Sequence, residues 1–183
     1  MKELSLKLIL SLTLLLLPLA VSAAVNIDGI YYNLNSDVKT AEVTYRRNFS
    51  YSGDLVIPSL VNYGGVDYSV TSITNAFSNC TELTSIKIPS SVTSISAGLF
   101  QGCTNLASII VDEENTVFDS RDNCNAVIRT ASNILISGCK STTIPNGITT
   151  IGQKAFLNCS GLTSITIPNS VTTTPVFNVS FYN

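Results

Sequence analysis

The sequence predicts a β-rich α/β solenoid of about five rungs, with short strands, short helical turns and an N-terminal β-hairpin cap. Two observations predict this fold class. The first is a unit of roughly 20–25 residues that recurs along the chain, as in repeat architectures. The second is an apolar composition, with 45% hydrophobic and 12% charged residues, which is too apolar for a disordered chain. The clearest copies of the unit are residues 70–89, 92–112 and 148–168.

Residues 1–24 are expected to form a secretory signal peptide. Lys2 and Lys7 precede an apolar run at residues 8–17, and small residues follow at 20–24. The run is too short to cross a bilayer as a helix. A buried core helix is the alternative, but no helical partner follows in the sequence. Cleavage after Ala23 and cleavage after Ala24 fit equally well, and the mature chain is expected to be secreted or held at the cell surface, without a transmembrane segment.

The composition argues against several classes of function. The chain has no histidine, which removes the Ser/His/Asp and Cys/His nucleophile arrangements and the commonest metal ligand. Its net charge is −2 with no basic run, so electrostatic recognition of nucleic acid is not expected. The acidic residues at 112–114, Asp119 and Asp122 lack the spacing of a calcium loop and are expected to be solvated. We therefore expect a protein that is not an enzyme and carries no cofactor or metal.

Residues 25–68 are expected to form an N-terminal β cap that includes the first rung. Polar and apolar residues alternate at 41–45, and turn residues such as Asp28-Gly29 bound the segments. This pattern is typical of half-buried antiparallel strands joined by hairpins. A hairpin block at this place covers the apolar face and the strand edge of the first rung.

The solenoid itself is expected at residues 69–172. Proline forces the residue before it to be extended and removes a hydrogen-bond donor, so an Ile-Pro dipeptide ends a short strand. Val111-Asp112 stands in the same register as the Ile-Pro dipeptides, and the five strand ends counted in this way are 31, 23, 33 and 23 residues apart. The dipeptides are Ile57-Pro58, Ile88-Pro89, Ile144-Pro145 and Ile167-Pro168.

Matching positions in three of the rungs carry a structural ladder of apolar residues. Its members are Phe77, Cys80, Leu83, Phe100, Cys103, Leu106, Phe156, Cys159 and Leu162. The Phe-x-x-Cys spacing suits one or two helical turns. From the leucine onward two of the copies, at residues 83–88 and 162–167, read L-x-x-I-x-I, the first half of a leucine-rich repeat, and the third, at residues 106–111, ends in valine. The β-branched segments 70–73, 92–95 and 148–151 are expected to form second short strands.

Residues 112–147 interrupt the regular unit. Strand-like segments at 115–118, 126–130 and 134–136 surround a turn, which predicts a hairpin built into the rung in place of the Phe-x-x-Cys turn. Residues 173–183 do not continue the repeat. They are expected to form an irregular tail that leaves the edge of the last rung open.

At residues 70–91 and 148–170, phrases of the form VTSI…AF..C..LTSI.IP.S resemble the BspA-like, Treponema-type leucine-rich repeat. Residues 115–147 resemble the modified hairpin repeat of that family, and the start of the mature chain resembles its cap. The likeness covers about residues 26–172. It implies a right-handed superhelix and a bacterial surface or secreted protein that binds host matrix proteins or other cells.

The five cysteines are expected to be mainly structural. Cys80, Cys103 and Cys159 share one repeat position, and stacked positions point their side chains the same way, which predicts a ladder of buried free thiols. Cys124 and Cys139 flank the hairpin and are the pair for which a disulfide is possible. The CxxC spacing of a zinc site is absent.

The candidate binding face is the exposed side of the strand row, because repeat proteins bind macromolecules on such extended surfaces. By register it carries Asp54, Val56, Ser85, Lys87, Ser108, Ile110, Ser141, Thr143, Ser164 and Thr166. We expect a protein-binding or adhesion module whose partner is an extracellular protein or a cell-surface macromolecule. Two alternatives remain: a structural element that self-associates at the open C-terminal edge, and a small secreted hydrolase with clustered carboxylates in a pocket.

Overall fold

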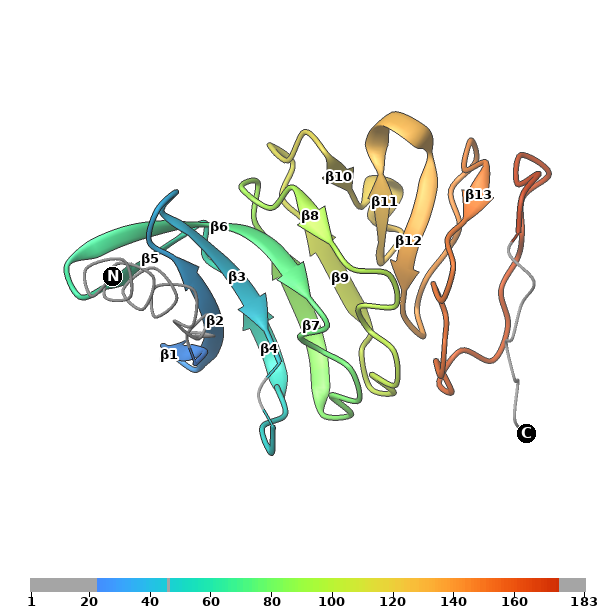
Figure 1. Ribbon diagram of the computed structural model, residues 1–183. Coiled ribbons are helices and arrows are strands. Elements are labelled where there is room, and N and C mark those ends of the chain that lie inside the picture. Colours follow the sequence, from blue (N-terminus) through green and yellow to red (C-terminus); the bar gives the residue numbers. More distant parts are fainter. Residues whose placement is uncertain (1–22, 46, 175–183) are drawn as a thin grey trace, which may run out of the picture.

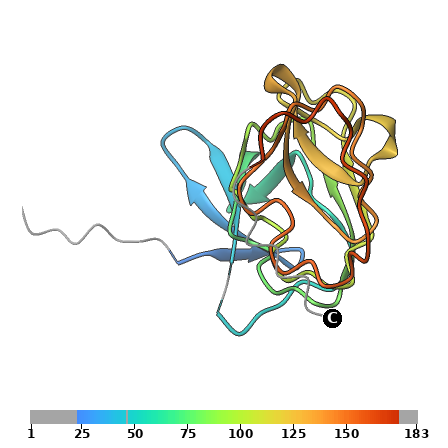
Figure 2. The same ribbon diagram turned by 90° about the vertical axis from the view of Figure 1, so that its right-hand side faces the viewer.

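The computed structural model describes residues 23–45 and 47–174 of the 183-residue chain. Within this part the fold is strand-rich and almost without helix (Figure 1). Nearly all of the predicted signal peptide, and residues 175–183 of the predicted tail, lie outside the described residues. From the N-terminal strands to residue 174, successive repeats lie side by side along one axis (Figures 1 and 2). Among the described residues, the helices are too short to cross a membrane.

The N-terminal strands form one curled six-stranded sheet, and the predicted hairpins are present in it. The edge strands β1 and β5 contact each other, so the sheet is partly barrel-like. The order is β1-β2-β3-β6-β5, with β8 paired separately to β6. The strands are β1 (Val25–Ile27), β2 (Ile30–Asn35), β3 (Thr40–Thr44), β5 (Leu60–Tyr63), β6 (Val66–Thr74) and β8 (Ser94–Ile95).

A parallel three-stranded sheet runs along one side of the repeats. It consists of β4 (Gly53–Val56), β7 (Leu83–Ile88) and β9 (Ser108–Val111), in that order. The register pairs Ile86 with Ile109, so equivalent positions of successive repeats stack on each other. Ile86 and Ile109 are buried, whereas the neighbouring Lys87 is exposed, as the alternation of side chains along a strand requires.

The hairpin predicted within the repeats is also present. Antiparallel strands β11 and β12 form it, β10 extends it on one side, and β13 pairs in parallel with β12 on the other. Two short 3-10 helices, η2 and η3, connect the strands. The elements are β10 (Phe118–Asp119), η2 (Arg121–Asn123), β11 (Ala126–Arg129), η3 (Thr130–Ser132), β12 (Ile134–Gly138) and β13 (Thr150–Ile151).

The Phe-x-x-Cys segments form hydrogen-bonded turns where helical turns were predicted. Each cysteine N–H donates to the carbonyl oxygen of the phenylalanine three residues earlier, at 3.1 to 3.2 Å. The residue before each cysteine has a positive φ, which is 60° at Asn79, 73° at Gly102 and 55° at Asn158. A left-handed residue of this kind ends a helix. The segments therefore form hydrogen-bonded turns that do not continue into a helix, and the prediction of helical turns at these positions was wrong.

The ladder forms the spine of the core. Eight of its nine residues are buried, and Cys159 is half-buried. Phe77 and Phe100 stack with ring centroids 5.9 Å apart, and Tyr51 meets Phe77 edge to face at 5.1 Å. At Gly138 a Cβ atom would lie 2.3 Å from the Phe156 ring. Glycine at this position therefore allows Phe156 to pack against the backbone of β12.

Strand β11 lies between two halves of the core. Val127 packs with the N-terminal cluster of buried residues, whereas Ala126 and Ile128 pack with the C-terminal cluster. All three side chains are buried, so both faces of this strand are covered. A strand buried on both faces reads as a continuous apolar run, which matches the sequence AVI at this place.

The last described repeat is incompletely covered. Ile165 and Ile167 occupy the positions of the buried Ile86 and Ile88, yet Ile165 is half-buried and Ile167 is 46% exposed. Within residues 23–174, the chain after Ile167 pairs with the preceding repeat through Thr150 and Thr173. These isoleucines therefore have no further described strand beside them to complete their burial.

Candidate functional site

The structure divides the predicted binding face into two parts. Six of its residues lie on β4, β7 and β9 in two rows, namely Asp54, Ser85 and Ser108, and Val56, Lys87 and Ile110. The other four are exposed but stand outside any strand, and they are Ser141, Thr143, Ser164 and Thr166. The sheet ends at β9, because β10 and β11 contact β9 where the row would continue. The expectation of one continuous strand row was wrong for these four residues.

In the first row, the carboxylate of Asp54 accepts hydrogen bonds from two hydroxyls on β7. Ser85 donates its hydroxyl to Asp54 Oδ1 at 2.6 Å, and Thr84 donates to the same oxygen at 2.8 Å. Hydrogen bonds from Ser85 and then Thr84 lower the pKa of the Asp54 carboxyl, because they favour its ionised form. The negative charge is therefore fixed in place at the N-terminal end of the face.

In the second row, apolar side chains stand at the two ends and a lysine lies between them. Val56 is 65% exposed and Ile110 is 50% exposed. The side chain of Lys87, between them in the register, is 51% exposed, and its Nζ lies 3.6 Å from Asp112 Oδ2. Adjacent strands are about 4.8 Å apart, so the three side chains form one continuous patch. We call Val56, Lys87 and Ile110 the strand patch.

Beside the strand patch is a shallow hollow of about 480 Å³, lined by Lys87, Ile110 and the acidic segment 112–114 among others. Asp112 interacts with Lys87 and accepts the N–H of Glu114 at 3.1 Å. Glu113 and Glu114 are exposed. Glu113 and Glu114 are therefore solvated as predicted, whereas Asp112 is engaged by Lys87 and by a backbone N–H.

The remaining acidic residues also have structural partners or face solvent. Burial opposes ionisation of Asp119, but hydrogen bonds from Arg121 and Thr130 outweigh it and lower the pKa of this carboxyl. Asp119 therefore fastens η2 to the start of η3, and the prediction that this carboxylate is solvated was wrong. Among the described residues, there is no group of three or more His, Cys, Asp or Glu side chains able to hold a metal ion.

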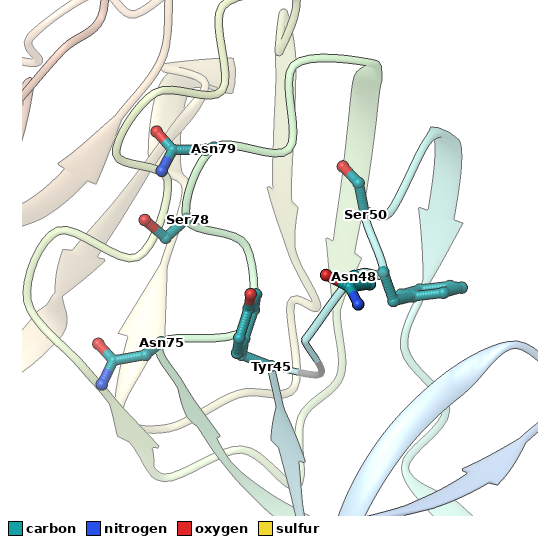
Figure 3. Close-up of a pocket in the computed structure, with 7 residues that line it drawn as sticks. Tyr45, Asn48, Ser50, Asn75, Ser78 and Asn79 are labelled. Carbon is teal, nitrogen blue, oxygen red and sulfur yellow. The ribbon is translucent and has the colours of Figure 1, made fainter.

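A second hollow, of about 580 Å³, lies where the cap meets the first repeats. Figure 3 shows Tyr45 between the segment carrying Asn75, Ser78 and Asn79 and the segment carrying Asn48 and Ser50. Phe49 completes the described lining. The sequence-based reasoning did not single out this hollow. The feature of the sequence that accompanies the hollow is an asparagine at three turns of positive φ, namely Asn48, Asn75 and Asn79. The sequence alone does not indicate that these three turns lie next to one another.

All five cysteines are free thiols, and the disulfide considered for Cys124 and Cys139 is not formed. The two have different partners: Cys124 Sγ donates to the Ala126 carbonyl at 3.8 Å, and Cys139 Sγ to the Asn125 carbonyl at 3.4 Å. Burial raises the pKa of the Cys103 thiol to about 12 and that of Cys159 to about 11. Raised thiol pKa values keep the reactive thiolate scarce, which suits packing rather than chemistry.

The family model for the BspA type leucine rich repeat region matches residues 65–139 and 135–183, with six copies. A search among curated proteins found no match.

Solved structures of bacterial leucine-rich repeat proteins are similar to this chain. One from Bacteroides ovatus ATCC 8483 is 30% identical with a TM-score of 0.53, and the match covers 81% of this chain and 36% of that one. Another from Eubacterium ventriosum ATCC 27560 is 26% identical with a TM-score of 0.51, covering 67% of this chain and 31% of that one. The chain therefore spans about a third of the length of these two proteins.

Proposed function

Because this chain belongs to the BspA-type leucine-rich repeat family, we propose that it is an exported protein-binding module that acts in adhesion. Members of this family are generally protein-binding or surface-associated, on a fold that is not enzymatic. In this proposal the repeats wind as a right-handed superhelix of about five rungs, capped by residues 25–68. The partner is an extracellular protein or another cell-surface macromolecule.

The observation that carries the proposal is the strand patch. Large apolar side chains that are exposed on neighbouring strands, with a charged group between them, are typical of a protein-binding surface rather than of a solvated one. The patch lies on rigid strands of a parallel sheet, so little conformational entropy is lost when a partner covers it. The cation Lys87 lies at the centre of the patch between two apolar side chains, which favours a partner that presents an acidic group near an apolar one.

The energy available from the patch is modest. Fully burying a Val or Ile side chain contributes about 1.5–3 kcal/mol. Since Val56 and Ile110 are already partly covered, burying the remainder contributes about 1 kcal/mol each. Losing both contributions should weaken binding about 30-fold.

A protein array tests the proposal. The mature chain, labelled and purified, is applied to a broad array of extracellular proteins, and saturable binding to at least one of them is expected. The V56S/I110S variant should bind that partner about 30-fold more weakly, and Lys87→Glu should also weaken binding. Leu60→Ser is the matched control, because Leu60 is equally exposed, at 52%, on a different sheet. Absence of saturable binding across the array would end this proposal.

Export is tested separately. When the full chain is produced in a bacterial host, the released protein should begin at Ala24 or Val25 by N-terminal sequencing. Retention of Met1 on a cytoplasmic product would contradict the signal-peptide part of the proposal without affecting the binding part.

Self-association is a second candidate function, favoured by the incompletely covered last repeat. Ile165 and Ile167 present apolar surface that a second copy is able to cover edge to edge. Light scattering after size-exclusion chromatography should then give a dimer or larger species that Ile167→Lys converts to monomer. A monomer at all concentrations would rule this candidate out.

A further inference from the structure

The hollow around Tyr45 arises from the way two neighbouring strands end. β3 and β6 run in parallel, with Thr44 paired to Thr74. Tyr45 and Asn75 follow these residues directly, so the two chains leave the sheet side by side. One then turns through Asn48 to Ser50 and the other through Ser78 to Asn79, and Figure 3 shows the space between them.

On one side of this hollow, the main chain at Asn75 and Asn79 is bonded to the next repeat. The N–H of Asn75 donates to Ser96 Oγ at 3.0 Å, and the N–H of Asn79 donates to the carbonyl oxygen of Gln101 at 2.7 Å. Both asparagines adopt positive φ, 49° and 60°, a conformation that asparagine tolerates better than most residues. The Asn75–Asn79 side of the hollow is therefore held by hydrogen bonds from its main chain to the next repeat, and not by the side chains that line it.

The lining has an unusual chemistry for its size. None of the described residues in it is charged, and they comprise three amides, two serine hydroxyls, Tyr45 and Phe49. Within residues 23–45 and 47–174, the side chains of Asn48, Asn75 and Ser78 make no hydrogen bond to other protein groups. Tyr45 is 50% exposed, so much of its ring is available to a ligand.

From this combination we propose that the hollow is a binding site for a neutral carbohydrate. Amide and hydroxyl groups each donate and accept hydrogen bonds, as the adjacent hydroxyls of a sugar require. An exposed tyrosine ring offers a flat apolar surface for the C–H face of a pyranose and a hydroxyl at its edge. A phosphate or carboxylate ligand would instead call for a cationic side chain, and none is present among the described residues of the lining.

The volume fits this class of ligand. Small-molecule pockets span about 300–1,000 Å³, and a hollow of about 580 Å³ has room for one or two pyranose rings. Its open shape favours the end of an oligosaccharide over an enclosed monosaccharide. This site is separate from the strand patch, since it lies at the ends of β3 and β6 rather than on β4, β7 and β9.

Isothermal titration calorimetry tests the proposal on the mature chain. The probes are neutral di- and trisaccharides, including maltotriose, lactose and N,N′-diacetylchitobiose, with sialyllactose as the anionic comparison. At least one neutral probe should bind with a Kd between about 10 µM and about 5 mM, as few groups contact it. Tyr45→Ala should weaken that binding about tenfold or more because the stacking surface is lost. Tyr45→Phe should retain it within about threefold.

Two further variants make the result specific. Tyr63→Ala is the matched control, because Tyr63 is 49% exposed on β5 and lies outside the lining. The affinity of this variant for the sugar should equal that of the parent protein. Asn75→Asp preserves shape and tolerance of positive φ but removes the amide donors, and it should weaken binding with an unchanged melting temperature. The proposal is overturned if no neutral probe binds, if sialyllactose binds preferentially, or if Tyr45→Ala and Tyr63→Ala behave alike.

Discussion

Replacing Tyr32 by phenylalanine is expected to stabilise the protein. The Tyr32 side chain is fully buried on β2, and its hydroxyl has no hydrogen-bond partner among the described residues. A buried polar group without a partner costs about 1–3 kcal/mol relative to its hydrated state. Phenylalanine keeps the ring and removes the oxygen, so the free energy of unfolding should rise by about 1 kcal/mol. For a chain of this size the melting temperature should rise by about 2–4 °C.

Tyr51→Phe is the matched comparison, because the Tyr51 hydroxyl is satisfied. It accepts the N–H of Tyr31 at 3.0 Å and donates to the carbonyl oxygen of Thr44 at 3.1 Å. Removing it should lower the free energy of unfolding by about 1–2 kcal/mol. Thermal and urea unfolding, followed by circular dichroism at neutral pH, measure both variants. If Tyr32→Phe destabilises the protein as Tyr51→Phe does, the Tyr32 hydroxyl has a partner, such as an ordered water, and the reasoning fails.

The buried Tyr32 hydroxyl also predicts how the stability of the protein changes with pH. Burial, and secondarily the neighbouring Tyr51, raises the pKa of Tyr32 well above its ordinary value of 10.0. The folded state therefore holds this proton more tightly than the unfolded state. The corresponding stability is fully present below the unfolded pKa and is lost as the pH rises above it. Between about pH 9 and about pH 11, Tyr32→Phe should lose less stability than the parent, and equal losses would contradict this.

Three further predictions concern the packing of the repeats. Asn115 is buried, donates to the carbonyl oxygens of Pro89 and Val92, and accepts two N–H groups. Asn115→Ala should therefore lower the free energy of unfolding, measured in urea, by about 2–4 kcal/mol. A loss under about 0.5 kcal/mol, as at a surface site, would be inconsistent with this reasoning. Gly138→Ala should cost about 1–3 kcal/mol, because its Cβ meets the Phe156 ring; a neutral result would show that the ring moves freely. Thiol titration should label the buried cysteines only on unfolding, and rapid labelling of several in the native protein would disprove their burial.

Much of the fold was predictable because repeats carry their own evidence. The positions of Ile86 and Ile88 recur at Ile109 and Val111, and a recurring apolar position stacks on its own copies whatever surrounds the repeat. The cap hairpins and the inserted hairpin were also predictable, since alternation bounded by turn residues is a local signal.

Two features of the fold were not predicted, because each depends on contacts that the local sequence pattern does not report. One left-handed residue, Asn79 or its equivalent, ended each predicted helical turn. The inserted hairpin displaced the strand row, so that Thr143 lies beside Cys124 instead of extending the sheet at β9. Neither outcome follows from the spacing of apolar residues, because both depend on where backbone hydrogen bonds go after the core has formed.

The sequence by itself determined the family, the repeat length, the inward positions and the exclusion of histidine chemistry, because each of these is a property of residue identity and spacing. Only the tertiary structure decided which exposed residues stand together. The strand patch requires three strands that are separated in sequence to pair in register, and the hollow around Tyr45 requires two parallel strands to end at the same level. Surfaces of this kind are determined by the pairing of strands that are far apart in the sequence. The pattern of buried residues restricts that pairing but does not specify which exposed residues it brings together.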